Sequence, residues 1–213
     1  RAADFDPVTL IGPLPMTLLV PADSRFNTLA DVKAEFARTK KPLTFGTWGV
    51  GSFAHMVGEL IRMETGIGLE YVPFQGAAPA MMDTVAGHVE LYFGALVSTL
   101  QHVTSKSLHA LAVTSMERVS VAPDIATMDE QGLKGFETGA WYGVSVASGT
   151  PTAIVQKLND GIARALRDPD VAKRFTAEGA VIVADTPEQF ATFFQGELSK
   201  WGKAVQASGA KVE

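Results

Sequence analysis

Cysteine is absent from this sequence of 213 residues, so the chain has no disulfide and no thiol chemistry. An exported protein and a cytosolic protein are both compatible with that absence. No apolar run approaches the roughly 18 residues that a membrane-spanning helix needs. The opening stretch, RAADFDPVTLIGPLP, lacks the charged and apolar regions of a secretory leader.

Clustered basic charge is also missing. Lys and Arg number 18 against 23 Asp and Glu, which gives a net charge of −5, and the basic residues are scattered. A nucleic-acid partner would require a concentrated basic face, so we predict no nucleic-acid binding. Hydrophobic residues make up 46% and charged residues 19%, which is typical of a folded chain of one large or two small domains.

Short apolar segments alternate with helical patterns in the first half of the chain. We predict strands at 17–21, 43–47, 69–74, 88–94 and 109–115, and helices at 28–40, 52–66, 78–87 and 96–105. Thr28 and Asp31 have the spacing of a capping box, and Gly66 is a helix stop. This alternation predicts a mostly parallel sheet with helices on both faces.

The pattern changes after Pro123. We predict a short helix at 125–131, an extended segment at 136–147, a helix capped by Thr150 with Pro151 in its first position, a helix restarting at Asp168–Pro169, and a strand at 181–183. Thr186 and Gln189 have the spacing of a second capping box, before a final helix with an aromatic stripe. That stripe is typical of a docking face, because its polar side is not basic enough for a membrane anchor.

The stretch TFGTWGVGSFAH, residues 44–55, has three glycines within six residues, at the junction of a predicted strand and a predicted helix. Glycines let backbone N–H groups approach a ligand, and a helix N-terminus adds unpaired N–H donors, so the turn favours an anion. A phosphate-binding loop would need Lys and Ser or Thr after the last glycine, and the sequence offers Ser52–Phe53. A dinucleotide would need an acidic residue at the far end of the next strand, whereas Glu70 lies at its start. Gly49, Gly51 and Ala54 nevertheless match the permissive glycine pattern of a dinucleotide site, so a dinucleotide, a small carboxylate and a simple tight turn all remain open.

A second turn, FQGAAPA at residues 74–80, also connects a strand to a helix, with Gly76 at the corner. In open α/β sheets, ligands bind beyond the carboxyl ends of the strands. Two such turns on neighbouring strands would therefore direct two sets of N–H groups at one crevice.

Other candidate groups are less specific. Ser52 and His55 could form a nucleophilic pair, although no acid is evident beside them. The spacing of His88, His102 and His109 does not match a metal site, so we predict no metal and no cofactor. Further expectations are that Glu59 and Glu64 are solvated helix charges, and that Trp141 and Tyr142 line a cleft or pack in the core.

Several phrases together resemble the Bug-type periplasmic receptors of tripartite tricarboxylate transporters. In order they are DFDPVTLIG, PLTFGTWGVGSFAHMVGELI, YVPFQGAAPAMMDTVAGHVELYF, LHALAVTS, PDIATMDEQGLKGFETGAWYGV, ASGTPTAIVQKLNDGIARALRDPDVAKRF and LSKWGKAVQASGAK. The resemblance implies an α/β fold of the periplasmic-binding-protein (Venus flytrap) kind, and a solute-binding protein rather than an enzyme. The alternative is a nucleotide-dependent or serine-based enzyme that uses the glycine turn.

The resemblance also implies which residues hold the solute, a small organic carboxylate. The implied contacts are Thr47, Trp48, Gly49, Val50, Gly51, Ser52, His55, Gly76, Ala77, Ala78 and Gly94, with Trp141 at the returning cross-over. Many relatives carry a polar Asp or Asn where this chain has Gly94, so one side-chain contact is missing here.

Relatives normally begin with a first-lobe segment that has its own glycine-rich loop, and nothing in this sequence resembles it. We therefore expect one complete parallel-sheet lobe at 16–140, with 1–15 and 141–213 forming the cross-over and the C-terminal part of the other lobe. The resemblance further implies a periplasmic location, membrane subunits of the transporter as partners, and a monomer when complete.

Overall fold

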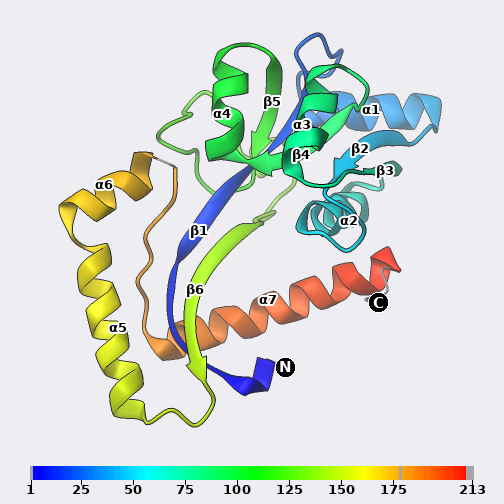
Figure 1. Ribbon diagram of the computed structural model, residues 1–213. Helices are drawn as coiled ribbons and strands as arrows, with labels where there is room; N and C mark the ends of the chain where they lie inside the picture. Colours follow the sequence, from blue (N-terminus) through cyan, green and yellow to red (C-terminus); the bar gives the residue numbers. More distant parts are fainter. Residues whose placement is uncertain (1, 178, 210–213) are drawn as a thin grey trace. The chain divides into compact units, whose positions relative to one another are not determined.

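The structure, a computed structural model, describes residues 2–177 and 179–209 (Figure 1). Its contacts divide the chain into two compact units. Unit 1 comprises Arg1–Leu14 and Gly139–Lys200, and unit 2 comprises Pro15–Thr138 and Trp201–Glu213. Strand β1 (Phe5–Pro21) and helix α7 (Pro187–Ser208) contribute residues to both units.

Unit 2 is built on a mixed sheet with the strand order β3-β2-β4-β1-β5. The strands besides β1 are β2 (Leu43–Thr47), β3 (Leu69–Pro73), β4 (Leu91–Ala95) and β5 (Leu108–Val113). Strand β2 is parallel to β3 and β4, as predicted, whereas β1 is antiparallel to both β4 and β5. The prediction of a mostly parallel sheet is therefore wrong for β1, the longest strand, and the sheet is mixed.

The reversed direction of β1 follows from its connection to β2. Strand β1 pairs with β4 from Met16 opposite Ala95 to Leu19 opposite Tyr92, so β1 ends near the edge where β2 and β4 begin. Helix α1 (Leu29–Thr39) therefore leaves and re-enters the sheet at the same edge, and it is not a crossover between parallel strands. The alternation of strands and helices alone could not distinguish these two connections.

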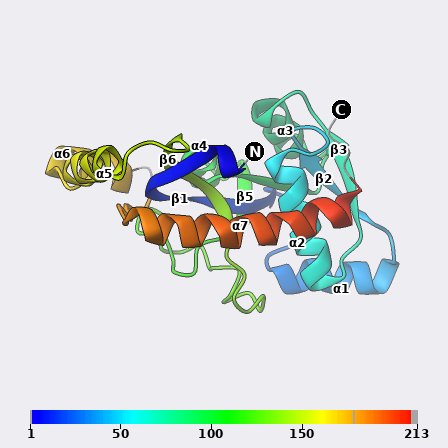
Figure 2. The same ribbon diagram turned by 90° about the horizontal axis from the view of Figure 1, so that it is seen from below.

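Helices cover both faces of the unit 2 sheet. Helix α2 (Phe53–Thr65) packs on β2, β3 and β4, while α3 (Ala77–Val85) and α4 (Leu96–Thr104) pack on β2, β4 and β5. The period of two along β4 explains the separation, because the Phe93 ring contacts Phe53 of α2 whereas a side chain at Gly94 would meet Thr99 of α4. Figure 2 shows α2 and α3 on opposite sides of β2.

Local capping signals set the helix ends where the sequence predicted them. The Thr28 side chain accepts the Asp31 N–H, and the Asp31 carboxylate accepts the Thr28 N–H, which completes the capping box of α1. Gly66 ends α2 in the left-handed region at φ 70°. The Thr186–Gln189 box of α7 also forms.

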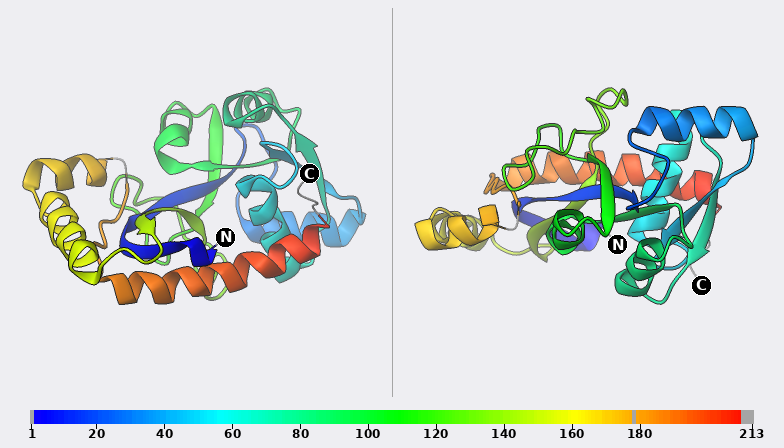
Figure 3. Two further views of the ribbon diagram at one scale, coloured as in Figure 1. Left: turned by 60° about the horizontal axis from the view of Figure 1, so that its bottom comes forward. Right: turned by 90° about the horizontal axis from the view of Figure 1, so that it is seen from above.

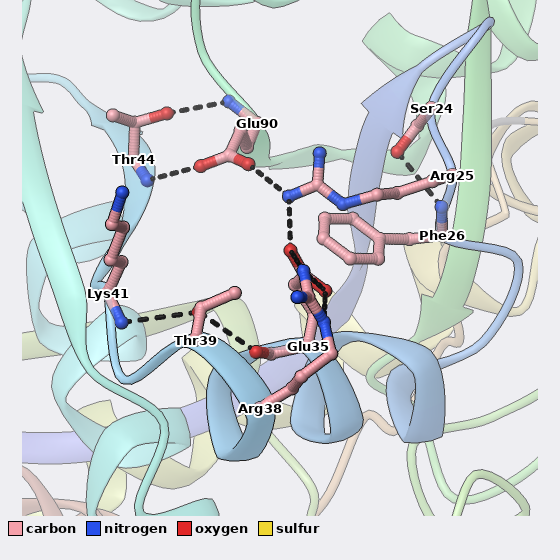
Figure 4. Close-up of polar contacts among 9 residues, drawn as sticks. All are labelled: Ser24, Arg25, Phe26, Glu35, Arg38, Thr39, Lys41, Thr44 and Glu90. Carbon is pink, nitrogen blue, oxygen red and sulfur yellow. Dashed lines mark hydrogen bonds and ion pairs between the residues drawn. The ribbon is translucent and has the colours of Figure 1, made fainter.

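The edge at which β2 and β4 begin is held by a separate polar cluster (Figure 4). The Arg25 guanidinium lies between Glu90 at 3.0 Å and Glu35 at 3.3 Å. The other oxygen of Glu90 accepts the Thr44 N–H, and Thr44 Oγ1 accepts the Glu90 N–H. This cluster joins α1 to two strands.

Unit 1 contains β6 (Gly139–Ala147), which pairs with β1, and helices α5 (Thr152–Leu166) and α6 (Pro169–Ala177), which follow one another in Figure 3. Two predictions fail here. The cap of α5 is Pro151, because the Thr150 hydroxyl instead donates to Ala147 O at 2.7 Å. Residues 181–183 are extended beside β1, with the Val183 N–H donating to Ile11 O, but they form no regular strand.

The predicted helix at 125–131 is a series of turns. Thr127 and Glu130 do exchange the hydrogen bonds of a capping box, at 2.8 and 3.1 Å. Gly132 and Gly135 follow with positive φ angles of 94° and 69°. This left-handed backbone conformation cannot continue a right-handed helix, so no regular helix forms.

Candidate functional site

Three parallel strands of unit 2 end at one edge of the sheet, and each is followed by a helix N-terminus (Figure 1). We call this the carboxyl edge and define it by residues 47–55, 74–80 and 94–99. The first and second segments contain the two glycine turns, and the third begins α4. Helix N-termini carry unpaired N–H groups and the positive end of the helix dipole, so the carboxyl edge is suited to an anion.

The first glycine turn has a closed backbone conformation. The Ser52 N–H donates to Gly49 O at 3.2 Å, which closes a four-residue turn. Gly51 occupies its third position at φ 78°, and Gly49 has φ 110°. Nothing lies within 4 Å of a Cβ built at either residue. The glycines are therefore needed for backbone conformation and for an unobstructed approach, not for packing space.

Only some of the amides in this turn are available to a ligand. The Gly51 N–H donates to Nδ1 of His55 at 3.0 Å, and the His55 N–H donates to Oγ of Ser52 at 3.3 Å. Within the described ranges, five amides of this segment have no hydrogen-bond acceptor: those of Trp48, Gly49, Val50, Phe53 and Ala54. The unpaired amides lie on both sides of Gly51 and Ser52, whose own N–H groups bond within the turn.

The second glycine turn lies directly beside the first. The Phe74 N–H donates to Thr47 O at 2.9 Å, so the ends of β2 and β3 are joined. Gly76 is the N-cap of α3 at φ 121°, and no side chain caps this helix. Ala77 and Ala78 are exposed, and their amides are also without an acceptor in the described part of the chain.

An apolar cluster fixes both turns to the sheet. Leu19, Ala80, Tyr92 and Leu108 form its buried centre, and Trp48 and Phe74, one from each turn, pack against it. The Tyr92 hydroxyl donates to Ala77 O at 3.2 Å. Burial raises the pKa of Tyr92 against the opposing effect of the Trp48 indole N–H, so the hydroxyl stays a donor at neutral pH.

The proposed pairing of Ser52 with His55 for nucleophilic chemistry does not form. Ser52 Oγ caps α2, and His55 Nδ1 is occupied by the Gly51 N–H. No hydrogen bond joins the imidazole to the hydroxyl among the residues that the structure describes. Glu70 also pairs opposite Thr44, near the start of β3, which is the wrong end of that strand for a ribose contact.

The prediction that Glu59 is a solvated helix charge is wrong, because its side chain is buried. Its side chain accepts from the Tyr71 hydroxyl at 2.6 Å and from Arg62 at 2.7 and 3.0 Å. Burial alone would raise the pKa of Glu59, but the hydrogen bonds from Arg62 and Tyr71 hold it below its usual value. A glycine in the middle of the helix, Gly58, could have indicated that this part of α2 is closely packed. A Cβ at Gly58 would lie 2.6 Å from the Tyr71 ring.

Gly94 lies at the end of β4, and its lack of a side chain has a steric cause. A Cβ at this position would lie 2.7 Å from the Tyr92 ring and 2.8 Å from the Thr99 methyl group. No polar side chain fits between them without moving one of the two neighbours.

Trp141 belongs to unit 1 and has a packing environment there. Its indole N–H donates to Glu197 at 3.1 Å, and its ring meets Phe190, Phe193 and Phe194 edge-on at 5.5–5.9 Å. Unit 1 also contains a hollow of about 340 Å³ between α5 and residues 184–186, lined in part by Asp160, Arg164 and Arg167.

Across the described ranges, no three His, Asp or Glu side chains are placed to bind a metal ion. None of the helices described has the length and apolarity required to cross a bilayer.

Comparison with known proteins identifies the family. The family described as "Tripartite tricarboxylate transporter family receptor" matches residues 1–210. The chain belongs to this family. Protein BugT of Bordetella pertussis is 31% identical over 210 residues, which cover 99% of this chain and 64% of BugT. The predicted resemblance to Bug-type receptors is thereby confirmed.

Solved structures confirm the fold class. Rpa4515 of R. palustris, solved with adipate, has a TM-score of 0.83 and 29% identity, covering 98% of this chain and 70% of its own. MatC from Rhodopseudomonas palustris, solved with bound malate, has a TM-score of 0.78 and 31% identity, covering 96% and 71%. The chain spans 60–64% of the length of three curated relatives that it matches over 95–99% of its own length.

Proposed function

We propose that the chain is part of an extracytoplasmic solute-binding protein that captures a small organic carboxylate for a tripartite transporter. The single observation that carries this proposal is the group of unpaired backbone amides at the carboxyl edge, contributed by two adjacent glycine turns. The family membership and the carboxylates in two related structures support it. In this proposal units 1 and 2 belong to the two lobes of the receptor.

The carboxyl edge would bind a negatively charged group without a positively charged side chain. Its three segments contain no Lys or Arg, so a carboxylate would be held by peptide dipoles and N–H groups alone. The proposed contacts are the amides of Trp48, Gly49 and Val50 in the first turn and of Ala77 and Ala78 in the second. Gly51, Ser52 and His55 would shape the turn.

Two of the side chains exposed on these segments are large and apolar. Val50 is 74% exposed in the first turn, and Val97 is 43% exposed in the first turn of α4. Gly94 adds no polar group. We therefore propose that the solute has an apolar body, as adipate has, and that it binds better than a solute with several hydroxyl or carboxyl groups, such as citrate.

The finer features of the family are proposed together with this role. They are a periplasmic location, membrane transporter subunits as partners, and no catalytic activity. The enzyme alternative gains no support from the geometry, because the His55 imidazole and Ser52 hydroxyl are engaged separately.

Binding by this chain should be weak, which sets the design of the assay. Three of the five proposed donors bonding a carboxylate at once contribute roughly 4–9 kcal/mol, and association costs about 4–15 kcal/mol. Ligands should therefore be tested up to tens of millimolar at constant ionic strength, on the order of the weak affinities expected. Thermal unfolding should shift to higher temperature with adipate and not with its uncharged dimethyl ester.

A pair of substitutions at one position tests the amide donors. Ala77→Pro removes one N–H at the first position of α3, where proline is tolerated, while Ala77→Ser retains it. We expect the adipate-dependent shift to fall in the first variant and to persist in the second. No response to adipate, malate, glutamate, benzoate or citrate, or equal responses of the two variants, would contradict the proposed function.

A further inference from the structure

We propose that His55 is a positioning residue: its imidazole holds the Gly51 amide, and so keeps the first glycine turn in the conformation that leaves the neighbouring amides free for a carboxylate. The inference deepens the proposed function and rests on it. It assigns His55 a role in shaping the turn and no contact with the solute.

His55 is tied to the turn at two points. Its Nδ1 accepts the Gly51 N–H at 3.0 Å, and its own N–H donates to the Ser52 side chain at 3.3 Å. The residue is only 6% exposed. An accepting Nδ1 requires the tautomer with the proton on Nε2, so the buried ring must be neutral to make this bond.

A fixed support lies behind the imidazole. The Tyr71 ring meets it edge-on with centroids 4.4 Å apart, and the Tyr71 hydroxyl donates to Glu59 at 2.6 Å. Glu59 is 3% exposed, and its second oxygen accepts two hydrogen bonds from Arg62. A buried carboxylate with both oxygens occupied is held in one place, and the ring it anchors restricts the imidazole.

Among the described residues, Glu59 on the same helix acts on the charge of His55, Tyr71 on β3 contacts its ring, and Arg62 bonds Glu59. Burial lowers the pKa of His55, and Glu59 opposes this effect only in part. Protonation would place a hydrogen on Nδ1, facing the Gly51 N–H. Two donors cannot bond to each other, so acid should release the turn.

The contact can be tested without any ligand by NMR of the ¹⁵N-labelled chain. We expect the His55 nitrogens to show the Nε2–H tautomer near neutral pH. The Gly51 amide should be protected from hydrogen exchange, and it should lose that protection as His55 becomes protonated. His55→Leu, which fills the space without an acceptor, should abolish the protection, and His55→Asn, whose side-chain oxygen can replace Nδ1, should restore it.

The affinity for adipate should follow the state of the turn. We expect the Kd to rise roughly threefold to tenfold in His55→Leu and to stay within about twofold in His55→Asn. Tyr71→Phe retains Nδ1 and the ring, so it should have a smaller effect than His55→Leu and provides a second test if that variant folds poorly.

The outcomes separate this inference from the proposed function. A Gly51 amide that is indifferent to His55→Leu and to the protonation of His55 would overturn the inference, whatever the solute affinity. If Gly51 responds as expected but no variant binds any carboxylate, the proposed function fails and the inference about affinity fails with it. A matched loss and recovery of Gly51 protection and of adipate affinity would support both.

Discussion

Gly58→Ala tests the packing that supports the candidate site. In the middle of an exposed helix this change normally stabilises, by about 1 kcal/mol, because alanine is the better helix former. At position 58 the new methyl group would lie 2.6 Å from the Tyr71 ring and 3.4 Å from Phe45. Such overpacking costs about 1–3 kcal/mol.

The displaced ring adds a second cost. Tyr71 would move away from Glu59, leaving an oxygen of a buried carboxylate without its donor, which costs about 1–3 kcal/mol. The three effects sum to a net loss of about 1–5 kcal/mol in the free energy of unfolding. Urea unfolding followed by circular dichroism measures it, provided that the slope with denaturant is unchanged.

Two matched controls and one double variant sharpen this test. Gly161→Ala in α5 and Gly202→Ala in α7 place the same methyl group where nothing lies within 4 Å, so they should be neutral or stabilising. Because Tyr71→Phe already lacks the hydroxyl, Gly58→Ala should cost less in that background, with a coupling of about 1 kcal/mol. A Gly58→Ala protein as stable as the unmodified chain, or strictly additive effects, would refute the packing argument.

Three further predictions concern other parts of unit 2. Gly94→Asp should lower the free energy of unfolding by at least about 2 kcal/mol, because it places a charge and a clash against the Thr99 methyl group; an unchanged urea midpoint would argue against this. Thr28→Ala should cost about 1 kcal/mol by removing the cap of α1, measured in the same way, whereas Thr28→Ser should cost little. The lowered pKa of His55 means that the unfolded chain binds the proton more readily, so stability should fall as the pH drops below 6.5, the ordinary histidine value. His55→Asn should lack this component, and parallel pH profiles for the two proteins would contradict the assignment.

Most helices of unit 2 could be predicted because their determinants are local. Thr28 and Asp31 satisfy each other across one helical turn, and Gly66 ends α2 where its left-handed backbone is needed. The same local logic failed at 125–131, since the capping pair is present but the glycines that follow prevent the helix from continuing.

The direction of β1 could not be predicted, because it depends on which strands lie beside it. Residues 17–21 read as a strand in any sheet, and nothing local indicates that their neighbours are β4 and β5 and not β2. Pairing between distant segments is a property of the folded chain, and the alternation of strands and helices carries no information about it.

The candidate site likewise has features that local sequence predicts and contacts that it does not. The glycine turns were predictable from composition and spacing, since positive φ angles at a strand-to-helix corner favour glycine. The burial of Glu59 involves Tyr71, which comes from a strand after α2, and the His55 imidazole that accepts the Gly51 N–H packs edge-on against the same ring. Those contacts require the packed helix and sheet.

A ¹⁵N NMR titration with adipate shows whether the unpaired amides at the carboxyl edge bind a carboxylate. Adipate should produce saturable shifts of the Trp48, Gly49, Val50, Ala77 and Ala78 amides, and its dimethyl ester should not. Shifts confined to the hollow beside Arg164 and Arg167, or no saturable shift at the two turns, would contradict it.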